Sequence, residues 1–205
     1  MKNILGNKGV TLTELMVVVA IIGILAAGAV PTYYTLMPKM RVEGAARQVA
    51  GDLQKARLWA TSKNTGYVVD FDSTANSYTI YTDNDGDYNG VPDSSNTVVS
   101  TVIIPASYPK IVFGSNVSLD PENSALAGGT AAAFVNPFDA TNSVKHYILF
   151  RPNGTALQSG AVYLIPKEDL TSGRHDRSRA VSVLGMTGFI KAWSHSGSAG
   201  GAWTS

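Results

Sequence analysis

The chain has 205 residues, and its 16 lysines and arginines against 15 aspartates and glutamates leave a net charge of +1, so no overall positive field would attract nucleic acid. It contains no cysteine, which excludes disulfides, thiolate catalysis and cysteine-ligated metal centres. Charged residues are 15% of the chain, well below the roughly 25% of an average soluble domain, whereas 44% are hydrophobic, enough for a packed core.

The apolar residues are concentrated near the N-terminus. Residues 10–30 contain one charge, Glu14, and as a helix these 21 residues would span about 31 Å, close to the hydrocarbon thickness of a bilayer. The nine residues before them carry Lys2 and Lys8 and no acid. Because positive flanking residues stay on the cytoplasmic side, this asymmetry predicts a membrane-spanning helix with the rest of the chain across the membrane.

Two other interpretations of this segment are a cleaved secretory signal peptide, with Ala27-Gly28-Ala29 as its cleavage site, and the core helix of a soluble protein. The length and complete apolarity of the run disfavour a core helix. Glu14 argues against both, because a carboxylate is out of place in a signal sequence. In a membrane it costs about 3 kcal/mol unless a cation meets it.

The pattern of a helix continues beyond Pro31. Apolar residues recur at spacings of three and four through residues 42–60, which predicts one buried face. Pro31 and Pro38 are expected to bend or break this helix, since each removes a backbone donor. Residues 63–66, Lys-Asn-Thr-Gly, are a plausible stop. These apolar positions are Val42, Ala45, Ala46, Val49, Leu53, Ala56 and Ala60.

From Tyr67 onward the hydrophobic period changes to two, which predicts strands. The last two strands are separated by residues 185–188, a hairpin connection. Residues 120–142 are rich in Ala, Gly, Asn and Pro and predict a long surface loop, and residues 194–205 predict a flexible tail. The class is therefore α+β. The expected strands are 67–71, 78–82, 98–104, 111–113, 147–150, 161–165, 180–184 and 189–193.

The start of the chain resembles the class III signal of type IV pilins and pseudopilins, in Gly9-Val10-Thr-Leu-Thr-Glu14 followed by the apolar run and Pro31. The resemblance implies that a prepilin peptidase cuts after Gly9 and methylates Val10, where the family usually has Phe. It also implies an assembly role for Glu14. Cleavage leaves one α-amine at Val10, which Glu14 of a neighbouring subunit could neutralise within the bilayer.

The rest of the chain resembles the GspH/FimT pseudopilin family. Residues 53–60 are similar to its "L..AR..A" helix, and residues 150–154 (Phe-Arg-Pro-Asn-Gly), 160–165 and 179–188 to its later strands. The resemblance implies a pilin-like fold, in which a long N-terminal transmembrane helix packs on a C-terminal antiparallel β-rich head. The parts would be a leader (1–9), a transmembrane helix (10–30), the helix continuation (31–64), a periplasmic β-rich domain (65–193) and the tail (194–205).

The implied function is that of a minor pseudopilin, a structural subunit of a type II secretion pseudopilus. The alternative is a minor type IV pilin in pilus biogenesis or DNA uptake. The implied location is the bacterial inner membrane, single-pass, with a periplasmic C-terminal domain. Partners would be other pseudopilins or pilins, the prepilin peptidase and the inner-membrane assembly platform. No enzyme motif or cofactor fingerprint is present, so neither catalysis nor a cofactor is expected.

Two loops are weaker site candidates. Asp83, Asp85, Asp87 and Asp93 alternate as in a calcium loop but lack its central Gly and its final Glu, which favours an acidic, solvated hairpin tip. Residues 174–179 are the one basic cluster. Some relatives bind DNA through a C-terminal GRxR element, but residues 188–191 here are Gly-Phe-Ile-Lys, so a solvated loop is favoured over nucleic-acid binding.

Overall fold

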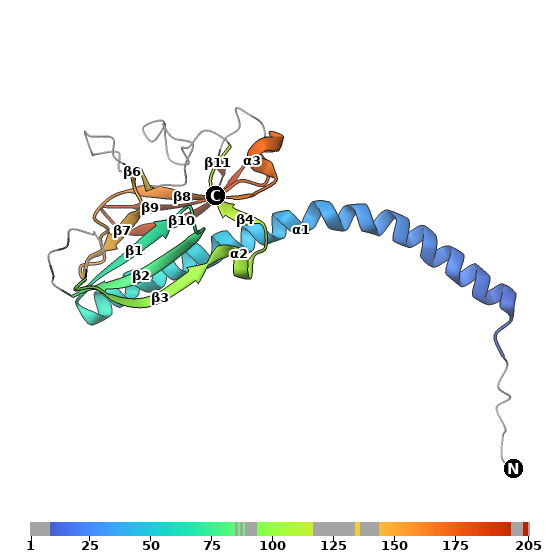
Figure 1. The fold of residues 1–205 in the computed structure, drawn as a ribbon, viewed down its shortest axis with the longest axis horizontal. Helices are drawn as coiled ribbons and strands as arrows, with labels where there is room; N and C mark the ends of the chain where they lie inside the picture. The colour runs from blue at the N-terminus through green and yellow to red at the C-terminus, as the bar shows by residue number, and fades with distance from the viewer. Residues whose placement is uncertain are drawn as a thin grey trace, which may run out of the picture. The chain divides into compact units, whose positions relative to one another are not determined.

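The computed structural model describes residues 9–84, 86, 88, 94–116, 134–135, 144–197 and 203–204. It divides into two compact units, Met1–Met37 and Pro38–Ser205. Helix α1, Leu12–Lys63, has 52 residues and contributes to both units. The second unit is the head, and it contains the strands of Figure 1.

Helix α1 is not broken at either proline, so that part of the expectation is wrong. A proline removes a single i→i−4 hydrogen bond. At Pro38 the carbonyl that loses its partner belongs to Tyr34, which is 71% exposed, so water can replace the bond. The helix ends at Lys63, as predicted, where Asn64 takes a left-handed conformation with φ 51°.

The apolar face predicted along residues 42–60 is confirmed, because every residue of that set is buried. Their spacing places them in one stripe of a 3.6-residue helix, and Ala at four of the seven positions lets the strands approach closely. Together with inward-facing residues of both sheets they form one hydrophobic core. Figure 1 shows the strands running along this second half of α1.

The first sheet has four antiparallel strands in the order β3-β2-β1-β7. Strands β1 and β2 are joined by a tight turn in which the Asp72 carboxylate accepts hydrogen bonds from the amides of Thr74 and Ala75. The strand prediction is confirmed here to within one residue. The bounds are β1 Gly66–Asp72, β2 Ser77–Asp83, β3 Thr97–Ile103 and β7 Tyr147–Phe150.

The second sheet has five antiparallel strands in the order β11-β10-β9-β8-β4. The hairpin predicted between residues 184 and 189 joins β9 to β10. Ala161, Tyr163 and Ala180 form a smaller cluster, against which Trp193 and Trp203 pack. The bounds are β4 Ile111–Phe113, β8 Gly160–Pro166, β9 Arg179–Leu184, β10 Phe189–His195 and β11 Trp203–Thr204.

The short elements are α2 Ile104–Ser107, α3 Asp169–Ser172, β5 Phe134–Val135 and β6 Val144–Lys145. Strands β5 and β6 pair with each other, so the stretch predicted as a loop, residues 120–142, includes strand residues. Its other residues, 120–133 and 136–142, lie outside the described part of the chain. Ile104 begins α2 and does not end β3.

The C-terminus differs most from the sequence prediction. Ser194 and His195 extend β10 and pair with Thr204 and Trp203 of β11, although residues 194–205 were predicted to be a flexible tail. The pairing is reinforced by packing, because the Trp203 ring lies 5.1 Å from that of His195 and 5.6 Å from that of Tyr163. The prediction of a flexible tail is therefore wrong for residues 194–195 and 203–204, because strand pairing and aromatic contacts fix them, whereas residues 198–202 and 205 lie outside the described part of the chain.

Candidate functional site

The start of α1 is fixed by a reciprocal cap. The Glu14 carboxylate accepts hydrogen bonds from the Thr11 backbone amide and from its hydroxyl, both at 2.9 Å. In return the Glu14 amide donates to the Thr11 hydroxyl at 3.3 Å. This is a capping box, the Thr-x-x-Glu signal at a helix N-terminus, and it was present in the sequence but not used there. It holds Glu14 one turn into the helix, close along the chain to Gly9 and Val10.

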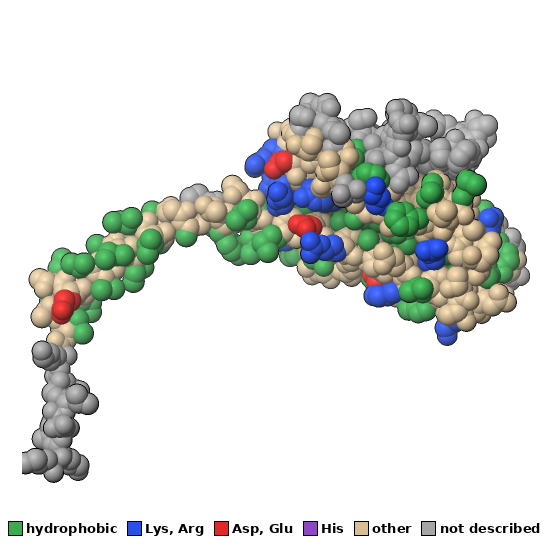
Figure 2. All heavy atoms as spheres, turned by 180° about the vertical axis from the view of Figure 1, so that it is seen from behind, with side chains coloured by type: hydrophobic (Ala, Val, Ile, Leu, Met, Phe, Trp, Pro, Cys, Tyr) green, Lys and Arg blue, Asp and Glu red, His purple; other side chains and the backbone are tan. Residues whose placement is uncertain are grey.

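The side chains that follow Glu14 are apolar and exposed. The segment Leu12–Ala29 is long and apolar enough to cross a membrane, with a mean hydropathy of 2.3 and none of it buried. Figure 2 shows hydrophobic side chains along this part of α1. A soluble domain would leave this surface in water at a large cost, since each apolar Å² costs about 25 cal/mol. A lipid or partner-helix environment removes that cost.

In the head, Arg57 joins three of the motifs that carried the family resemblance. Its Nε donates to the Gly154 carbonyl at 2.9 Å, and its Nη2 donates to the Thr187 carbonyl at 2.9 Å. Gly154 lies in the loop between β7 and β8, and Thr187 in the β9–β10 hairpin. The planar fork of arginine reaches both carbonyls at once, so one side chain of α1 holds the loop that connects the two sheets and a hairpin of the second sheet.

The two glycines at this contact allow it. Gly188 has φ +62°, and a Cβ there would lie 2.2 Å from the Gly154 carbonyl oxygen and 2.9 Å from Arg57 Nε. Gly154 has φ +81° and approaches Thr61 and Arg57. A side chain at Gly188 would therefore push the loop and the hairpin apart. We call Arg57, Gly154, Thr187 and Gly188 the arginine clamp.

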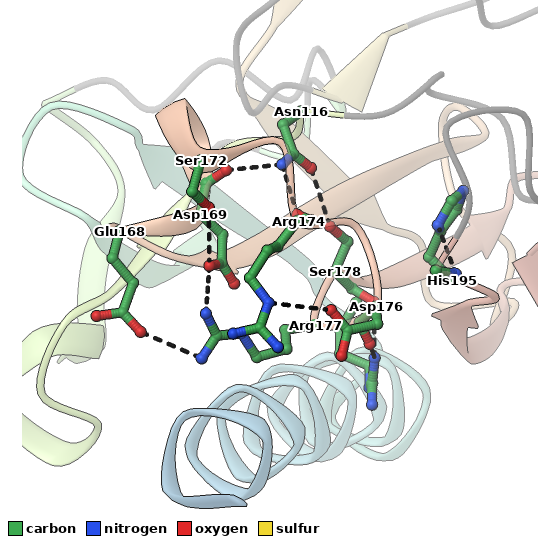
Figure 3. Close-up of polar contacts among 11 residues, drawn as sticks. Asn116, Glu168, Asp169, Ser172, Arg174, Asp176, Arg177, Ser178 and His195 are labelled. Atoms are coloured by element: carbon green, nitrogen blue, oxygen red, sulfur yellow. Dashed lines mark hydrogen bonds and ion pairs between the residues drawn. The ribbon is translucent and has the colours of Figure 1, made fainter. Parts of the chain in front are cut away.

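The basic cluster at residues 174–179 is not the solvated loop that the sequence favoured. Arg177 is 5% exposed, and its guanidinium pairs with the buried Asp169 at one nitrogen and with Glu168, at 3.1 Å, at another. Figure 3 shows these two acids beside Arg177 above α1. Because Arg177 is buried and paired, it is not available to a phosphate.

Neighbouring groups hold this loop in place. Asn116 donates through Nδ2 to the carbonyls of Asp169 and Arg174, both at 2.7 Å (Figure 3). Arg179 is also buried, at 7% exposure, and donates to the carbonyls of Asp176 and Ser178. Arg174 alone of the three arginines is exposed, and it lies 3.8 Å from Asp176. The cluster thus packs the head and offers little to nucleic acid.

The acidic loop can be described only at its ends. Asp83 is the last residue of β2 and is 4% exposed, and its carboxylate accepts a hydrogen bond from the Gly86 amide at 3.3 Å. Asn84 bridges to the other side of the loop, donating to the Ser95 carbonyl and to the Thr97 hydroxyl at 2.8 Å. Asp85, Asp87 and Asp93 lie outside the described residues. Calcium binding by this loop therefore stays a hypothesis.

The histidines are not gathered into a metal centre in the described part of the chain, where no three His, Cys, Asp or Glu residues converge. The rings of His175 and His195 lie 6.2 Å apart, and His195 is buried against Trp203. That His195 is buried at the end of a strand was not foreseen from the sequence.

Two family models match the chain. One, described as Type II transport protein GspH, matches residues 45–187, and the other, described as the prokaryotic N-terminal methylation motif, matches residues 5–30. The fimbrial protein of Moraxella nonliquefaciens is 39% identical over 66 residues, which are 29% of this chain and 43% of that protein. The chain thus spans under half the length of that relative.

Two solved structures have chains similar to this one. The type IV minor pilin FimU of Pseudomonas aeruginosa has a TM-score of 0.44 at 14% identity and covers 73% of this chain and 86% of its own. The minor pseudopilin EpsH from the Type 2 Secretion System of Vibrio cholerae has a TM-score of 0.46 at 9% identity and covers 75% and 97%.

An apolar, capped N-terminal helix that continues into the core of an antiparallel β head defines a pilin-like structural subunit. The methylation motif over residues 5–30 agrees with that class. Because the GspH model covers well over half of the chain, including Arg57, Gly154 and Thr187 of the arginine clamp, the chain belongs to the GspH family.

Proposed function

We propose that this chain is a minor pseudopilin of a type II secretion system, a structural subunit that supports protein secretion across the outer membrane. The observation that carries the proposal is the match of residues 45–187 to the Type II transport protein GspH. The exposed apolar segment Leu12–Ala29 supports the coarser part of the proposal, because a filament subunit needs such a helix to pack beside its neighbours.

The anchor carries the proposed maturation. Residues 1–9 form the leader, a prepilin peptidase cuts after Gly9, and the new N-terminal Val10 is methylated. Residues 10–30 then span the inner membrane and the head lies in the periplasm. Glu14 neutralises the Val10 amine of an adjacent pseudopilin during assembly. The capping box supports this role, because it holds the carboxylate at the helix start.

Mass spectrometry of the mature protein tests the maturation. A chain that starts with methylated Val10 is the expected product, and a chain that starts at Val30, as signal-peptide cleavage would give, overturns the proposal. Glu14→Gln is expected to leave cleavage intact but to reduce incorporation into filaments at least tenfold, since tenfold corresponds to about 1.4 kcal/mol, less than the cost of an unpaired membrane charge. Thr11→Ser, which keeps the capping hydroxyl, is the matched control.

The second candidate is a minor type IV pilin with a role in pilus biogenesis or DNA uptake. The specific observation in its favour is the 39% identity to a fimbrial protein over 66 residues. Deleting the chain and scoring secretion, twitching and transformation separates the two. Loss of secretion alone supports the pseudopilin, whereas loss of twitching or transformation with normal secretion supports the pilin.

A further inference from the structure

A small hollow opens in the head between α1 and the outer edge of the five-stranded sheet. Its volume is about 160 Å³, and its residues come from α1, β9, β10 and β11. It lies at this edge because β11 is the outermost strand of the sheet and pairs with the end of β10. The polar residues that line it are Glu43, Arg47, Arg179, Ser194 and Thr204, and Ala46, Ala192 and Trp193 complete the lining.

Arg179 is the unusual group in this hollow. It is 7% exposed, and its Nη1 donates to two backbone carbonyls, those of Ser178 at 2.8 Å and Asp176 at 3.2 Å. Among the described residues no carboxylate lies within 4.0 Å of it. A buried cation without a counter-ion is costly, and Arg177, only two residues away, has two acids where Arg179 has none.

The pKa of Arg179 is consistent with the lack of a described carboxylate within 4.0 Å of its guanidinium. Burial lowers the pKa of Arg179, and the charges of Glu43 and Asp176 oppose that effect from a distance. In the structure Glu43 pairs instead with Arg47, and the Asp176 carboxylate lies 3.8 Å from Arg174 Nε.

The other polar groups of the hollow are mostly hydrogen-bond donors. Arg47 is held at its rim by Glu43, with 76% of its side chain exposed. The hydroxyls of Ser194 and Thr204 lie 3.0 Å apart, and each donates to the backbone carbonyl of the other residue at 3.2 Å, so an incoming acceptor would replace one of these two bonds. Among the described lining residues two are arginines and one is an acid, so this part of the lining carries a net positive charge. Figure 2 shows that basic side chains also outnumber acidic ones on the visible face of the head.

We propose that this hollow receives the carboxylate of an Asp or Glu side chain from an adjacent pseudopilin or pilin subunit. The identity of the partner subunit rests on the proposed function, whereas the choice of a carboxylate rests on the residues that line the hollow. A carboxylate carries the one negative charge that the lining lacks, and arginine forks bind it in a bidentate manner. A polyanion such as DNA fits less well, because it needs a row of cations and would meet Glu43 at the rim.

The first test uses the mature full-length chain in detergent micelles and follows the arginine Nε–Hε signals by NMR. Sodium glutarate is titrated against sodium chloride at equal ionic strength. Saturable shifts at Arg179 with glutarate alone are expected, and their loss in Arg179→Gln but not in Arg174→Gln, an exposed arginine of the same loop. Where Arg179→Gln fails to fold, Arg47→Gln should weaken binding at least tenfold. Equal shifts with both salts overturn the proposal.

Inorganic phosphate in the same titration distinguishes the two oxyanion sources. Weaker binding of phosphate than of glutarate supports a protein carboxylate. Phosphate binding as tight as that of glutarate, or tighter, overturns that assignment and identifies a phosphate site. These titrations use the isolated chain without a filament, so their result tests the hollow as a carboxylate site and does not depend on the proposed function.

The partner is tested in assembled filaments. A photo-reactive residue in place of Thr204, at the edge of the hollow, is cross-linked and the partner peptide is sequenced. The expected peptide contains an Asp or Glu. Changing that acid to Lys in the partner should reduce incorporation of this chain into filaments at least tenfold, and Arg47→Glu in this chain should restore incorporation. A cross-linked peptide without an acid, or a charge exchange that restores nothing, overturns the assignment of the occupant.

Discussion

The arginine clamp makes the sharpest prediction about how the head is held on its helix. Arg57→Met keeps the aliphatic part of the side chain and removes both hydrogen bonds, to the carbonyls of Gly154 and Thr187. The loop between β7 and β8 and the β9–β10 hairpin then lose their common attachment to α1. We expect the head to remain folded but to be less stable.

The size of the effect follows from the environment of the two bonds. A hydrogen bond from a charged donor contributes about 1.5–3 kcal/mol. The bond to Gly154 is part-buried and the bond to Thr187 is exposed, so the second lies at or below the low end of that range. The loss should total about 2–3 kcal/mol, which for a domain of this size lowers Tm by about 5–10 °C.

Thermal unfolding of the full chain in micelles, followed by tryptophan fluorescence, measures this loss. Trp59 reports on the head because its ring packs 5.8 Å from that of Tyr67. Arg47→Met is the matched control, since it makes the same chemical change on the same helix but breaks only an exposed pair with Glu43, worth less than about 0.5 kcal/mol. If the two variants unfold at the same temperature, the clamp does not stabilise the head.

A double-mutant cycle tests whether the glycine belongs to the same contact. Gly188→Ala places a Cβ 2.2 Å from the Gly154 carbonyl oxygen and should displace the loop. Once Arg57 has been changed to Met, that displacement breaks no further Arg57 hydrogen bond. The combined loss should therefore be smaller than the sum of the two single losses by at least about 0.5 kcal/mol. Simple additivity would refute the shared contact.

Three further predictions concern other parts of the head. Asp169→Asn leaves Arg177 buried with Glu168 as its remaining acid, so chemical denaturation should show a loss of about 2–3 kcal/mol, and a loss under 0.5 kcal/mol would contradict the pairing. Burial raises the pKa of Asp70 above its ordinary 3.8, so the folded head binds the proton more tightly than the unfolded chain and loses stability as pH rises above 3.8. Asp70→Asn should therefore raise Tm at pH 7, and this gain should fade toward pH 3.8. An equal gain in Tm at both pH values would refute the reasoning. Trp203→Ala removes the packing on His195 and Tyr163 and should cost about 1–2 kcal/mol in thermal unfolding, since the ring is only partly buried, whereas a flexible tail would cost nothing.

Local patterns predicted the elements well because their signals lie within a few residues. The apolar stripe of α1 and the alternation in β2 each follow from a period that adjacent positions reveal, whereas β1 is buried at four consecutive residues. Pro31 and Pro38 do not break α1, because a long helix loses only a single hydrogen bond at each of them. The flexible tail was predicted from a composition rich in serine and glycine, and composition does not show that Trp203 packs on the cluster that contains Tyr163.

The functional features also divide into those that the sequence predicts and those that depend on the tertiary structure. The sequence by itself predicted the anchor, because Gly9, Val10, Glu14 and the apolar run follow one another closely and their proposed chemistry depends on order along the chain. Only the tertiary structure decided what the arginines do. Arg57 meets partners 97 and 130 residues away, and Arg177 is paired where Arg179 is not. Burial and pairing of a charge depend on which distant segments the fold brings around it, and no local pattern encodes that.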